Sequence, residues 1–194
     1  LEQHTEVALV KCVQGGGTEL ARIALGGWID GGDPDSVLLC MPSQKAAEAY
    51  VREKVQPLLE NPRLARYVTD RSYDVRKDQI DLAHMSIHVA WTGSAQTMAT
   101  RALRRAVSDE TDKAQELRRE ATSLDLVRDR QVTFGRRAKH FVLSTPTTTD
   151  GPIWKTWLSI ADKRFFHVPC PLCGAADRLV WERVRWPSVD ETDD

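Results

Sequence analysis

Five short apolar runs, separated by longer amphipathic stretches, are the feature that most constrains how this chain can fold. Each run has the length of a buried strand, and none approaches the ~18 apolar residues needed to cross a bilayer. Strands that alternate with helical patterns are typical of β-α-β units. The sequence therefore predicts an α/β fold with a mainly parallel central sheet flanked by helices. The expected strands are residues 7–10, 36–41, 86–91, 105–108 and 140–144.

The spacing of apolar residues between these runs predicts helices. One opens at Thr18, and a second runs from Ser43 to residue 58 with a kink at Pro57. A short helix is expected to begin at Asn61-Pro62. The range 112–130 is charged and rich in good helix formers, so it is predicted to be a largely exposed helix.

The composition sets limits on location and partners. The 194 residues are 41% hydrophobic and 28% charged, with a formal net charge of -1. A balanced charge creates no general attraction to nucleic acid or to anionic membranes, so any nucleic-acid contact must be local. Candidate contacts are the basic clusters 118–119 and 136–140. Without a recognisable signal peptide or an apolar span, the chain is expected in the cytoplasm, away from membranes.

The stretch "KCVQGGGTEL", Lys11 to Leu20, lies between an expected strand and an expected helix, where phosphate-binding loops occur. The usual pattern, G-x-x-x-x-G-K-[ST], is matched at Gly16 and Thr18. However, Lys11 stands at the place of the first glycine and Gly17 at the place of the lysine. Either the flexible Lys11 reaches the phosphates from the front of the loop, or it is an exposed residue that leaves a strand. The first alternative predicts nucleotide contacts at Lys11, Gln14, Gly15, Gly16, Gly17 and Thr18.

Two adjacent carboxylates, Asp109 and Glu110, follow the expected strand 105–108. In phosphate-loop ATPases the first carboxylate of such a pair holds Mg²⁺ together with the loop hydroxyl, here Thr18, and the second activates the attacking water. The alternative is that these acids simply open the following helix, where the helix dipole favours them. The strand before them is also poor in aliphatic residues.

A third motif, Ser144-Thr145-Pro146-Thr147, follows the expected strand 140–144. Small hydroxyl residues at a strand's carboxyl end can contact a γ-phosphate and pass its loss to a neighbouring element. Alone, the motif is an ordinary capped turn. Because the loop, the carboxylates and the hydroxyl turn each follow a strand, the sequence predicts that all three meet in one crevice.

These motifs together resemble the ATPase domain of the large terminase subunit of tailed bacteriophages, in its lambda-type gpA family. "KCVQGGGTEL" resembles the altered phosphate loop of that family, "DETD" its Walker B end and "FVLSTPT" its coupling motif. "MPSQKAAEAYVREKVQPLLENPRL" and "FFHVPCPLCGAADRLVWERVRWP" resemble further segments. The resemblance implies a P-loop NTPase (RecA/ASCE-like) domain over 1–165, followed by a linker or incomplete zinc-knuckle segment over 166–194.

The resemblance also implies a function and partners. It implies an ATPase motor that drives double-stranded DNA into a procapsid, with ATP and Mg²⁺ bound by Lys11, Thr18 and Asp109 and with Glu110 as the catalytic carboxylate. Ser144 to Thr147 would couple hydrolysis to movement, with Ser144 and Thr145 also contacting the nucleotide. A homo-oligomeric ring, a portal protein, a small terminase subunit and the host cytoplasm are implied in the same way.

The chain departs from the family pattern in two respects. Gln14 stands where lambda-type loops can carry an arginine, so that charge must come from elsewhere; Arg101, Arg104 and Arg105 are candidates for a finger presented to a neighbouring subunit. The nuclease domain of large terminases is also not encoded here, as expected for a fragment. Two rival readings stay open: a fragment of a helicase or DNA-repair ATPase, and a degenerate phosphate-loop module without turnover.

The four cysteines divide into two kinds. Cys12 and Cys40 are expected to be solitary buried thiols. Cys170 and Cys173 form a C-x-x-C turn that suits zinc, but zinc needs four ligands, and His167 is at best a third. The family resemblance implies a second pair downstream, so we expect half a zinc site and no stoichiometric zinc in this chain.

Overall fold

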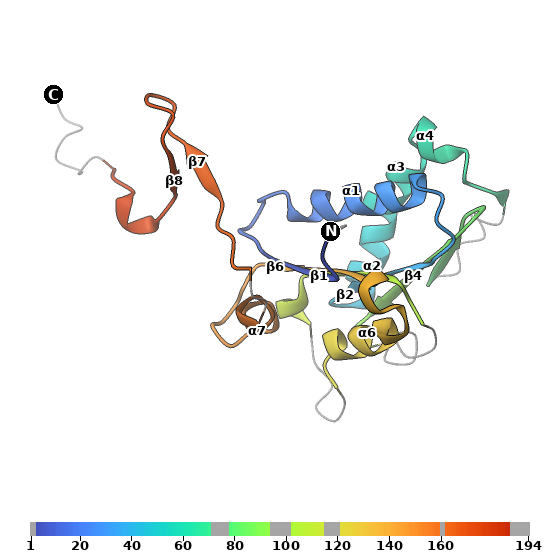
Figure 1. The fold of residues 1–194 in the computed structure, drawn as a ribbon. Coiled ribbons are helices and arrows are strands. Elements are labelled where there is room, and N and C mark those ends of the chain that lie inside the picture. Colours follow the sequence, from blue (N-terminus) through green and yellow to red (C-terminus); the bar gives the residue numbers. More distant parts are fainter. Residues whose placement is uncertain (1–2, 71–77, 94–101, 115–120, 160–161, 187–194) are drawn as a thin grey trace. The chain divides into compact units, whose positions relative to one another are not determined.

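The computed structural model describes residues 3–70, 78–93, 102–114, 121–159 and 162–186 (Figure 1). The chain divides into two compact units, residues 1–160 and 161–194. The functional distinction between 1–165 and 166–194 stays a prediction. No helix within the described ranges is long and apolar enough to span a bilayer.

The first unit is built on a six-stranded sheet in the order β1-β6-β5-β2-β4-β3. The five strands predicted from the sequence all form and pair in parallel, and a short strand that was not predicted, β3, runs antiparallel at one edge. The predicted α/β fold with a mainly parallel sheet is thus confirmed. The strands are β1 Glu6–Val10, β2 Val37–Met41, β3 Gln79–Asp81, β4 Ser86–Trp91, β5 Arg105–Asp109 and β6 Lys139–Ser144.

Helices cover both faces of this sheet (Figure 1). One face carries α1 (Gly17–Asp30) and a chain of short helices between β2 and β4. The other face carries α6 (Ser123–Gln131) and α7 (Pro152–Ser159). The short helices are α2 Gln44–Tyr50, the π-helix η1 Val51–Val55, α3 Gln56–Leu59 and α4 Pro62–Ala65, and single 3-10 segments are η3 Thr111–Lys113 and η4 Val132–Arg137.

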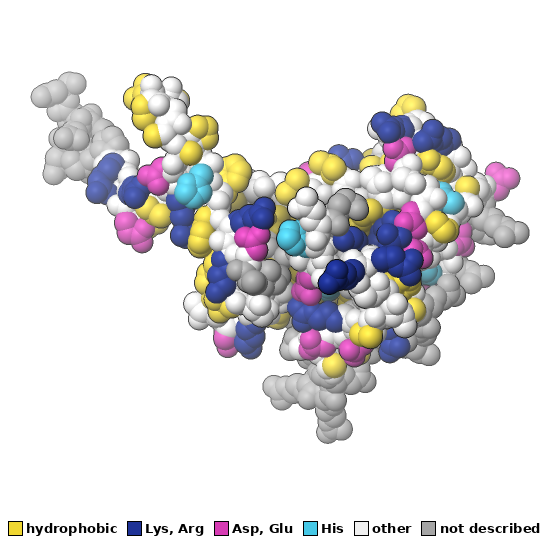
Figure 2. Space-filling model, viewed as in Figure 1, with side chains coloured by type: hydrophobic (Ala, Val, Ile, Leu, Met, Phe, Trp, Pro, Cys, Tyr) yellow, Lys and Arg dark blue, Asp and Glu magenta, His cyan; other side chains and the backbone are white. Residues whose placement is uncertain are grey.

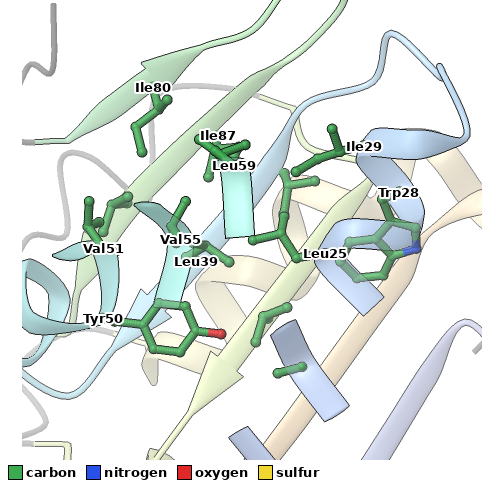
Figure 3. Packing of buried hydrophobic residues seen from close by; sticks show 14 of the residues in the cluster. Leu25, Trp28, Ile29, Leu39, Tyr50, Val51, Val55, Leu59, Ile80 and Ile87 are labelled. Carbon is green, nitrogen blue, oxygen red and sulfur yellow. The ribbon is translucent and has the colours of Figure 1, made fainter. Parts of the chain in front are cut away.

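The strict alternation of side chains along each strand divides the core between these two layers. In β2, Leu39 packs with the α1 layer, whereas Leu38 packs with Val127 of α6. The larger cluster joins Leu25 of α1 and Val55 of η1 over the sheet (Figure 3). Because β2 is buried on both faces, its sequence is a continuous apolar run, as parallel strands require.

Two predicted helices differ in extent. Of the helix expected over 112–130, the described residues form the single turn η3 and then α6, which begins at Ser123 because the Thr122 side chain accepts the Asp125 N–H and caps it. Residues 115–120, which include the basic pair 118–119, lie outside the described residues. The helix expected over 43–58 is interrupted by the wider turn η1 just before Pro57, which occupies the first turn of α3. Proline lacks an N–H, so the expected break is confirmed there.

For some residues the predicted exposure or burial is wrong. Cys12 is exposed in the loop after β1, whereas Cys40 is buried as predicted. Within the basic cluster 136–140, Lys139 and His140 are buried because β6 lies in the middle of the sheet. On the face drawn in Figure 2, Lys and Arg side chains are interspersed with Asp and Glu, in keeping with the balanced charge.

The second unit contains a small antiparallel hairpin, β7 (His167–Pro169) and β8 (Ala176–Arg178), followed by the 3-10 turn η5 (Trp181–Arg183). Cys170 and Cys173 lie in the turn of this hairpin. The backbone N–H groups of Cys173 and Leu172 point at the Cys170 sulfur and lower the pKa of its thiol. Within the described residues no group of three or more Cys, His, Asp or Glu side chains could hold a metal, so a zinc site remains a prediction that needs further ligands.

Candidate active site

The strand order brings the three predicted motifs together. β6 lies between β1 and β5, with Val10 beside Ser144 and Asp109 beside Leu143. The carboxyl ends of these parallel strands therefore meet at one edge of the sheet, and the Lys11 N–H donates to the Ser144 carbonyl at 3.0 Å. This edge is where parallel α/β sheets usually bind ligands.

The loop after β1 turns sharply into α1. Gly16 is the N-cap of α1 with φ of 75°, a left-handed conformation that favours glycine, and Gln14 also has a positive φ of 58°. No side chain caps α1, so the N–H groups of its first turn lack partners within the helix. Close packing also explains Gly15, since a β-carbon there would lie 2.8 Å from Cys12 Sγ. The loop thus presents free N–H donors.

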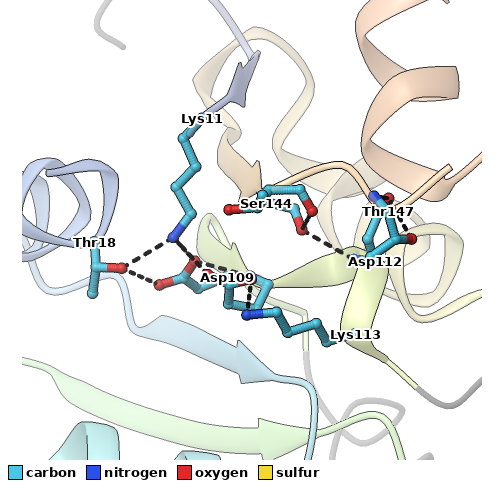
Figure 4. Close-up of polar contacts among 9 residues, drawn as sticks. Lys11, Thr18, Asp109, Asp112, Lys113, Ser144 and Thr147 are labelled. Carbon is cyan, nitrogen blue, oxygen red and sulfur yellow. Dashed lines mark hydrogen bonds and ion pairs between the residues drawn. The ribbon is translucent and has the colours of Figure 1, made fainter. Parts of the chain in front are cut away.

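Lys11 extends over Gly17 into the site. A β-carbon at Gly17 would stand 2.6 Å from Lys11 Cδ, so the absence of a side chain at residue 17 makes room for the displaced lysine. Lys11 Nζ lies 3.2 Å from Thr18 Oγ1, 3.1 Å from Asp109 Oδ1 and 2.9 Å from Glu110 Oε1 (Figure 4). These three acceptors satisfy all three ammonium donors. The alternative of an exposed lysine leaving a strand is wrong, because the side chain is only 9% exposed.

The two carboxylates differ in their surroundings. Asp109 is buried and accepts the Thr18 hydroxyl at 2.9 Å and the Glu110 N–H at 2.9 Å. Glu110 has φ of 56°, which is unusual for a residue other than glycine, and its N–H also donates to the Leu143 carbonyl. Its carboxylate lies between Lys11 and Lys113, with Lys113 Nζ 3.0 Å from Oε2. Strained backbone of this kind clusters at functional sites.

The ion pairs fix the protonation states. Burial tends to lower the pKa of Lys11, but its hydrogen bonds and attraction to Glu110 and Asp109 outweigh burial and raise that pKa. Burial tends to raise the pKa of Glu110, but Lys11 and Lys113 outweigh it and lower that pKa. Lys11 is therefore a cation and Glu110 an anion at neutral pH.

The loop and Glu110 line an open cavity of about 270 Å³, and Asp109 is buried beside it. Five of its lining residues were not predicted as site residues: Cys12, Val13, Glu19, Lys54 and Lys113. Lys54 comes from the π-helix η1, and its Nζ lies 2.7 Å from Glu19 Oε1. No pattern in the sequence around Lys54 indicates this position, although π-turns such as η1 are frequent at functional sites. The lining is Lys11, Cys12, Val13, Gln14, Gly15, Gly16, Gly17, Thr18, Glu19, Lys54, Glu110, Lys113 and Thr145.

Two residues of the hydroxyl turn, Ser144 and Thr145, lie in different environments. Thr145 lines the cavity, but Ser144 is fully buried and does not. Ser144 Oγ accepts the Asp112 N–H at 3.2 Å and donates to the Thr145 carbonyl. Ser144 thus supports the turn from behind, because its place in β6 points its side chain away from α1.

The arginine candidates do not reach the site. Arg101 lies outside the described residues. Arg104 and Arg105 lie at the start of β5, the opposite end from Asp109, and pair with Asp33 there. Arg105 also stacks on Trp28 and is buried. Both arginines therefore anchor the entry of the sheet, away from this chain's own site, and a role for either as a finger presented to a neighbouring subunit stays a prediction.

Comparison with solved structures places the same fold in phage packaging proteins. The large terminase ATPase domain of Thermus phage P74-26 is 12% identical with a TM-score of 0.59, covering 91% of this chain and 72% of that one. A mutant form of that domain is 13% identical with a TM-score of 0.60, at 91% and 73% coverage. A chain of the viral genome packaging motor assembly of bacteriophage Phi-29 is 12% identical with a TM-score of 0.53, at 91% and 53% coverage.

Sequence comparison is more specific. No curated protein sequence is significantly similar to this chain. The family described as phage terminase large subunit gpA, ATPase domain, matches residues 1–194. The resemblance drawn from the loop, the carboxylates and the hydroxyl turn is thereby confirmed. This chain belongs to the gpA family of phage terminase large subunit ATPase domains.

Proposed function

We propose that the chain binds Mg²⁺-ATP at the carboxyl ends of β1, β5 and β6 and hydrolyses it to drive viral DNA into a procapsid. The observation that carries the proposal is that the side chains of Thr18, Asp109 and Glu110 converge on Lys11 within hydrogen-bonding distance. All of these residues except the buried Asp109 line one cavity. That set matches the parts that phosphoryl transfer needs: a cation, a metal-binding hydroxyl and carboxylate, and a base.

The phosphates are assigned to the loop. The N–H groups of Gln14, Gly16, Gly17 and Thr18 and the positive end of α1 would bind phosphate oxygens, whereas the Gly15 N–H already donates to the Cys12 carbonyl. Lys11 would add a charge from the front of the loop, since its flexible stem lies in the space that Gly17 leaves open. Thr145, which lines the cavity, would lie near the γ-phosphate.

Mg²⁺ is assigned to the Thr18 hydroxyl and the Asp109 carboxylate. The Lys11 ammonium is already within hydrogen-bonding distance of both oxygens, so a cation fits between them. When bound with ATP, Mg²⁺ neutralises negative charge that develops on the phosphates. Lys11 would then exchange the carboxylates for phosphate oxygens.

Glu110 is assigned the role of base. A water oxygen forms the new bond to the γ-phosphorus, and the bond from that phosphorus to the bridging oxygen of ADP breaks. The water proton passes to Glu110, whose lowered pKa keeps it ionised before the reaction. Movement of Lys11 toward the phosphates would free Glu110 Oε1 for that proton.

Membership of the terminase family supports the partners that we propose. They are double-stranded DNA, a ring of identical subunits around it, and the portal and small terminase proteins, all in the host cytoplasm. Within the described residues the cations that line the cavity are lysines, and Arg22 is engaged by Glu19 beside it. An arginine, if the reaction uses one, would come from Arg101 or from a neighbouring subunit.

Titration with Mg²⁺-ATP and measurement of its turnover, with DNA present, test the proposal. Lys11→Ala is expected to weaken nucleotide binding, and Glu110→Gln to retain binding and abolish turnover. Lys45→Ala, an exposed lysine of α2, is the matched control. Nucleotide binding that is unaffected by Lys11→Ala would contradict the displaced-lysine assignment. Binding without turnover in the wild type would favour the degenerate-module alternative.

A further inference from the structure

Asp112 connects three segments that lie around the site. Its N–H donates to Ser144 Oγ at 3.2 Å. Its carboxylate accepts the Thr147 N–H at 2.9 Å, the Thr147 hydroxyl at 3.3 Å and the Ile153 N–H at 2.8 Å. Figure 4 shows the bonds from Asp112 to Ser144 and Thr147. One residue of η3 is therefore bonded to the end of β6, to the turn after it and to the first turn of α7.

The contact with α7 is specific in its geometry. Ile153 is the second residue of α7, and its N–H would otherwise lack a partner within the helix. The Asp112 carboxylate satisfies it and places a negative charge near the positive end of the helix. Gly151, just before α7, is buried, and a β-carbon there would overlap Asp112 Oδ2. The backbone before α7 thus approaches the carboxylate as closely as it can.

The same turn carries the proposed base. Glu110 lies two residues before Asp112, and its backbone is fixed by its N–H bonds to Leu143 and Asp109 and by the Lys113 N–H that its carbonyl accepts. Any shift of the Glu110 turn, for example when Lys11 leaves the carboxylate, would therefore move the Asp112 carboxylate and the start of α7 with it.

We propose that Asp112 is a positioning residue that holds the Glu110 turn, the Thr147 turn and α7 as one unit, so that a change at the nucleotide site is transmitted to α7. The transmission of a change at the nucleotide site rests on the function proposed for that site. The connection of the three segments by Asp112 does not depend on that function. Asp112 touches no reacting atom, and its effect on hydrolysis acts through Glu110.

A stacked pair of tryptophans gives α7 an optical signal. Trp154 and Trp157 have ring centroids 5.2 Å apart; Trp154 directly follows Ile153, and Trp157 lies about one helical turn after it. Binding of Mg²⁺ with adenylyl imidodiphosphate is expected to change tryptophan fluorescence in the wild type. Trp154→Phe should remove this change and so assign it to α7.

Asp112→Ala is the main test, with Asp129→Ala, at an exposed position of α6, as the matched control. We expect Asp112→Ala to leave the affinity for Mg²⁺-adenylyl imidodiphosphate within about twofold, to lower kcat at least about tenfold and to abolish the fluorescence change. Asp112→Asn keeps one acceptor oxygen and should fall between wild type and Asp112→Ala. The control should behave as wild type. An unchanged kcat and fluorescence response in Asp112→Ala would overturn the proposal, as would equal losses of affinity and kcat in Asp112→Asn, which would indicate only a folding role.

Amide hydrogen exchange without nucleotide tests the connection by itself. The Thr147 and Ile153 amides should exchange slowly in the wild type and faster in Asp112→Ala, while amides of β4 stay unchanged. Equal exchange at Thr147 and Ile153 in both proteins would show that Asp112 does not hold these segments. If the wild type bound no nucleotide, the proposed function and the transmission to α7 would fail, and the exchange rates would still decide the connection.

Discussion

The stem of Lys11 lies over the α-carbon of Gly17, so that a β-carbon at residue 17 would stand 2.6 Å from Lys11 Cδ. The two departures of this loop from the usual phosphate-binding pattern therefore depend on each other: the lysine at residue 11 can reach the site only because residue 17 is glycine. This dependence can be tested directly.

Gly17→Ala is expected to push Lys11 away from the site and weaken Mg²⁺-ATP binding at least about tenfold, or ~1.4 kcal/mol. Nucleotide titration measures the change. Gly27→Ala is the matched control in the same helix, because nothing lies within 4 Å of a β-carbon there. It should bind normally and unfold at the same or slightly higher temperature, since alanine favours helices by about 1 kcal/mol over glycine. Normal binding by Gly17→Ala would contradict the arrangement.

Moving the lysine tests the same relationship in the opposite sense. Lys11→Ala removes the stem that occupies the space beside residue 17, so the double variant Lys11→Ala with Gly17→Lys can hold a lysine at its usual position. We expect each single variant to bind Mg²⁺-ATP weakly and the double variant to regain part of the affinity, giving a coupling free energy of about 1 kcal/mol or more in a double-mutant cycle. Strictly additive effects would mean that the two positions are independent.

Lys113 holds the pKa of Glu110 down from the open side of the cavity. Lys113→Gln removes that stabilisation of the anion, so the pKa of Glu110 should rise. Since the base must be ionised, the acid limb of the kcat–pH profile should move to higher pH, and activity below neutrality should fall. Lys45→Gln should leave the profile unchanged. If the acid limb of Lys113→Gln stays at the wild-type pH, it does not report the ionisation of Glu110.

Lys54 brings a positive charge to the cavity from η1 and is held there by Glu19. We expect Lys54→Gln to lower kcat/KM for Mg²⁺-ATP about tenfold, because a cation near the phosphates is lost. Glu19→Gln removes the competing carboxylate and should not lower kcat/KM. Steady-state kinetics of both variants distinguish this role from a merely structural ion pair, whose loss would affect both variants alike.

His140 is fully buried in β6, and burial lowers its pKa to about 4; its Nε2 lies 2.9 Å from Ser108 Oγ. The unfolded chain binds a proton near pH 6.5 and the folded chain only near pH 4, so the unfolded state holds more protons between these values. The free energy of unfolding should therefore fall by about 3 kcal/mol as pH drops from 6.5 to 4. Denaturant titrations across this range measure the loss.

A comparison of variants isolates this contribution. His140→Gln should flatten the pH dependence of unfolding between pH 6.5 and 4, whereas His4→Gln, at an exposed position, should leave it unchanged. An identical slope in His140→Gln and wild type would mean that other groups cause the pH dependence.

Local pattern was enough to predict the strands and the motifs, but not the contacts among them. Apolar runs identified all five parallel strands, and the position of each motif after a strand predicted the shared crevice. Lys54 was missed because nothing in its own sequence neighbourhood indicates that η1 approaches the loop. Asp112 was read as part of a helix because its partners, Thr147 and Ile153, lie 35 and 41 residues away in sequence.

The position of β6 between β1 and β5 also bears on how the protein folds. Lys11 and Asp109 are 98 residues apart, and the strand that separates their strands is made after both. β5 pairs with β2, but the only strand that pairs with β1 in the described sheet is β6, so β1 joins the sheet only when β6 inserts. Such non-local pairing slows folding. During synthesis the nucleotide site should therefore appear late and in a single step, and ATP binding would report that the sheet is complete.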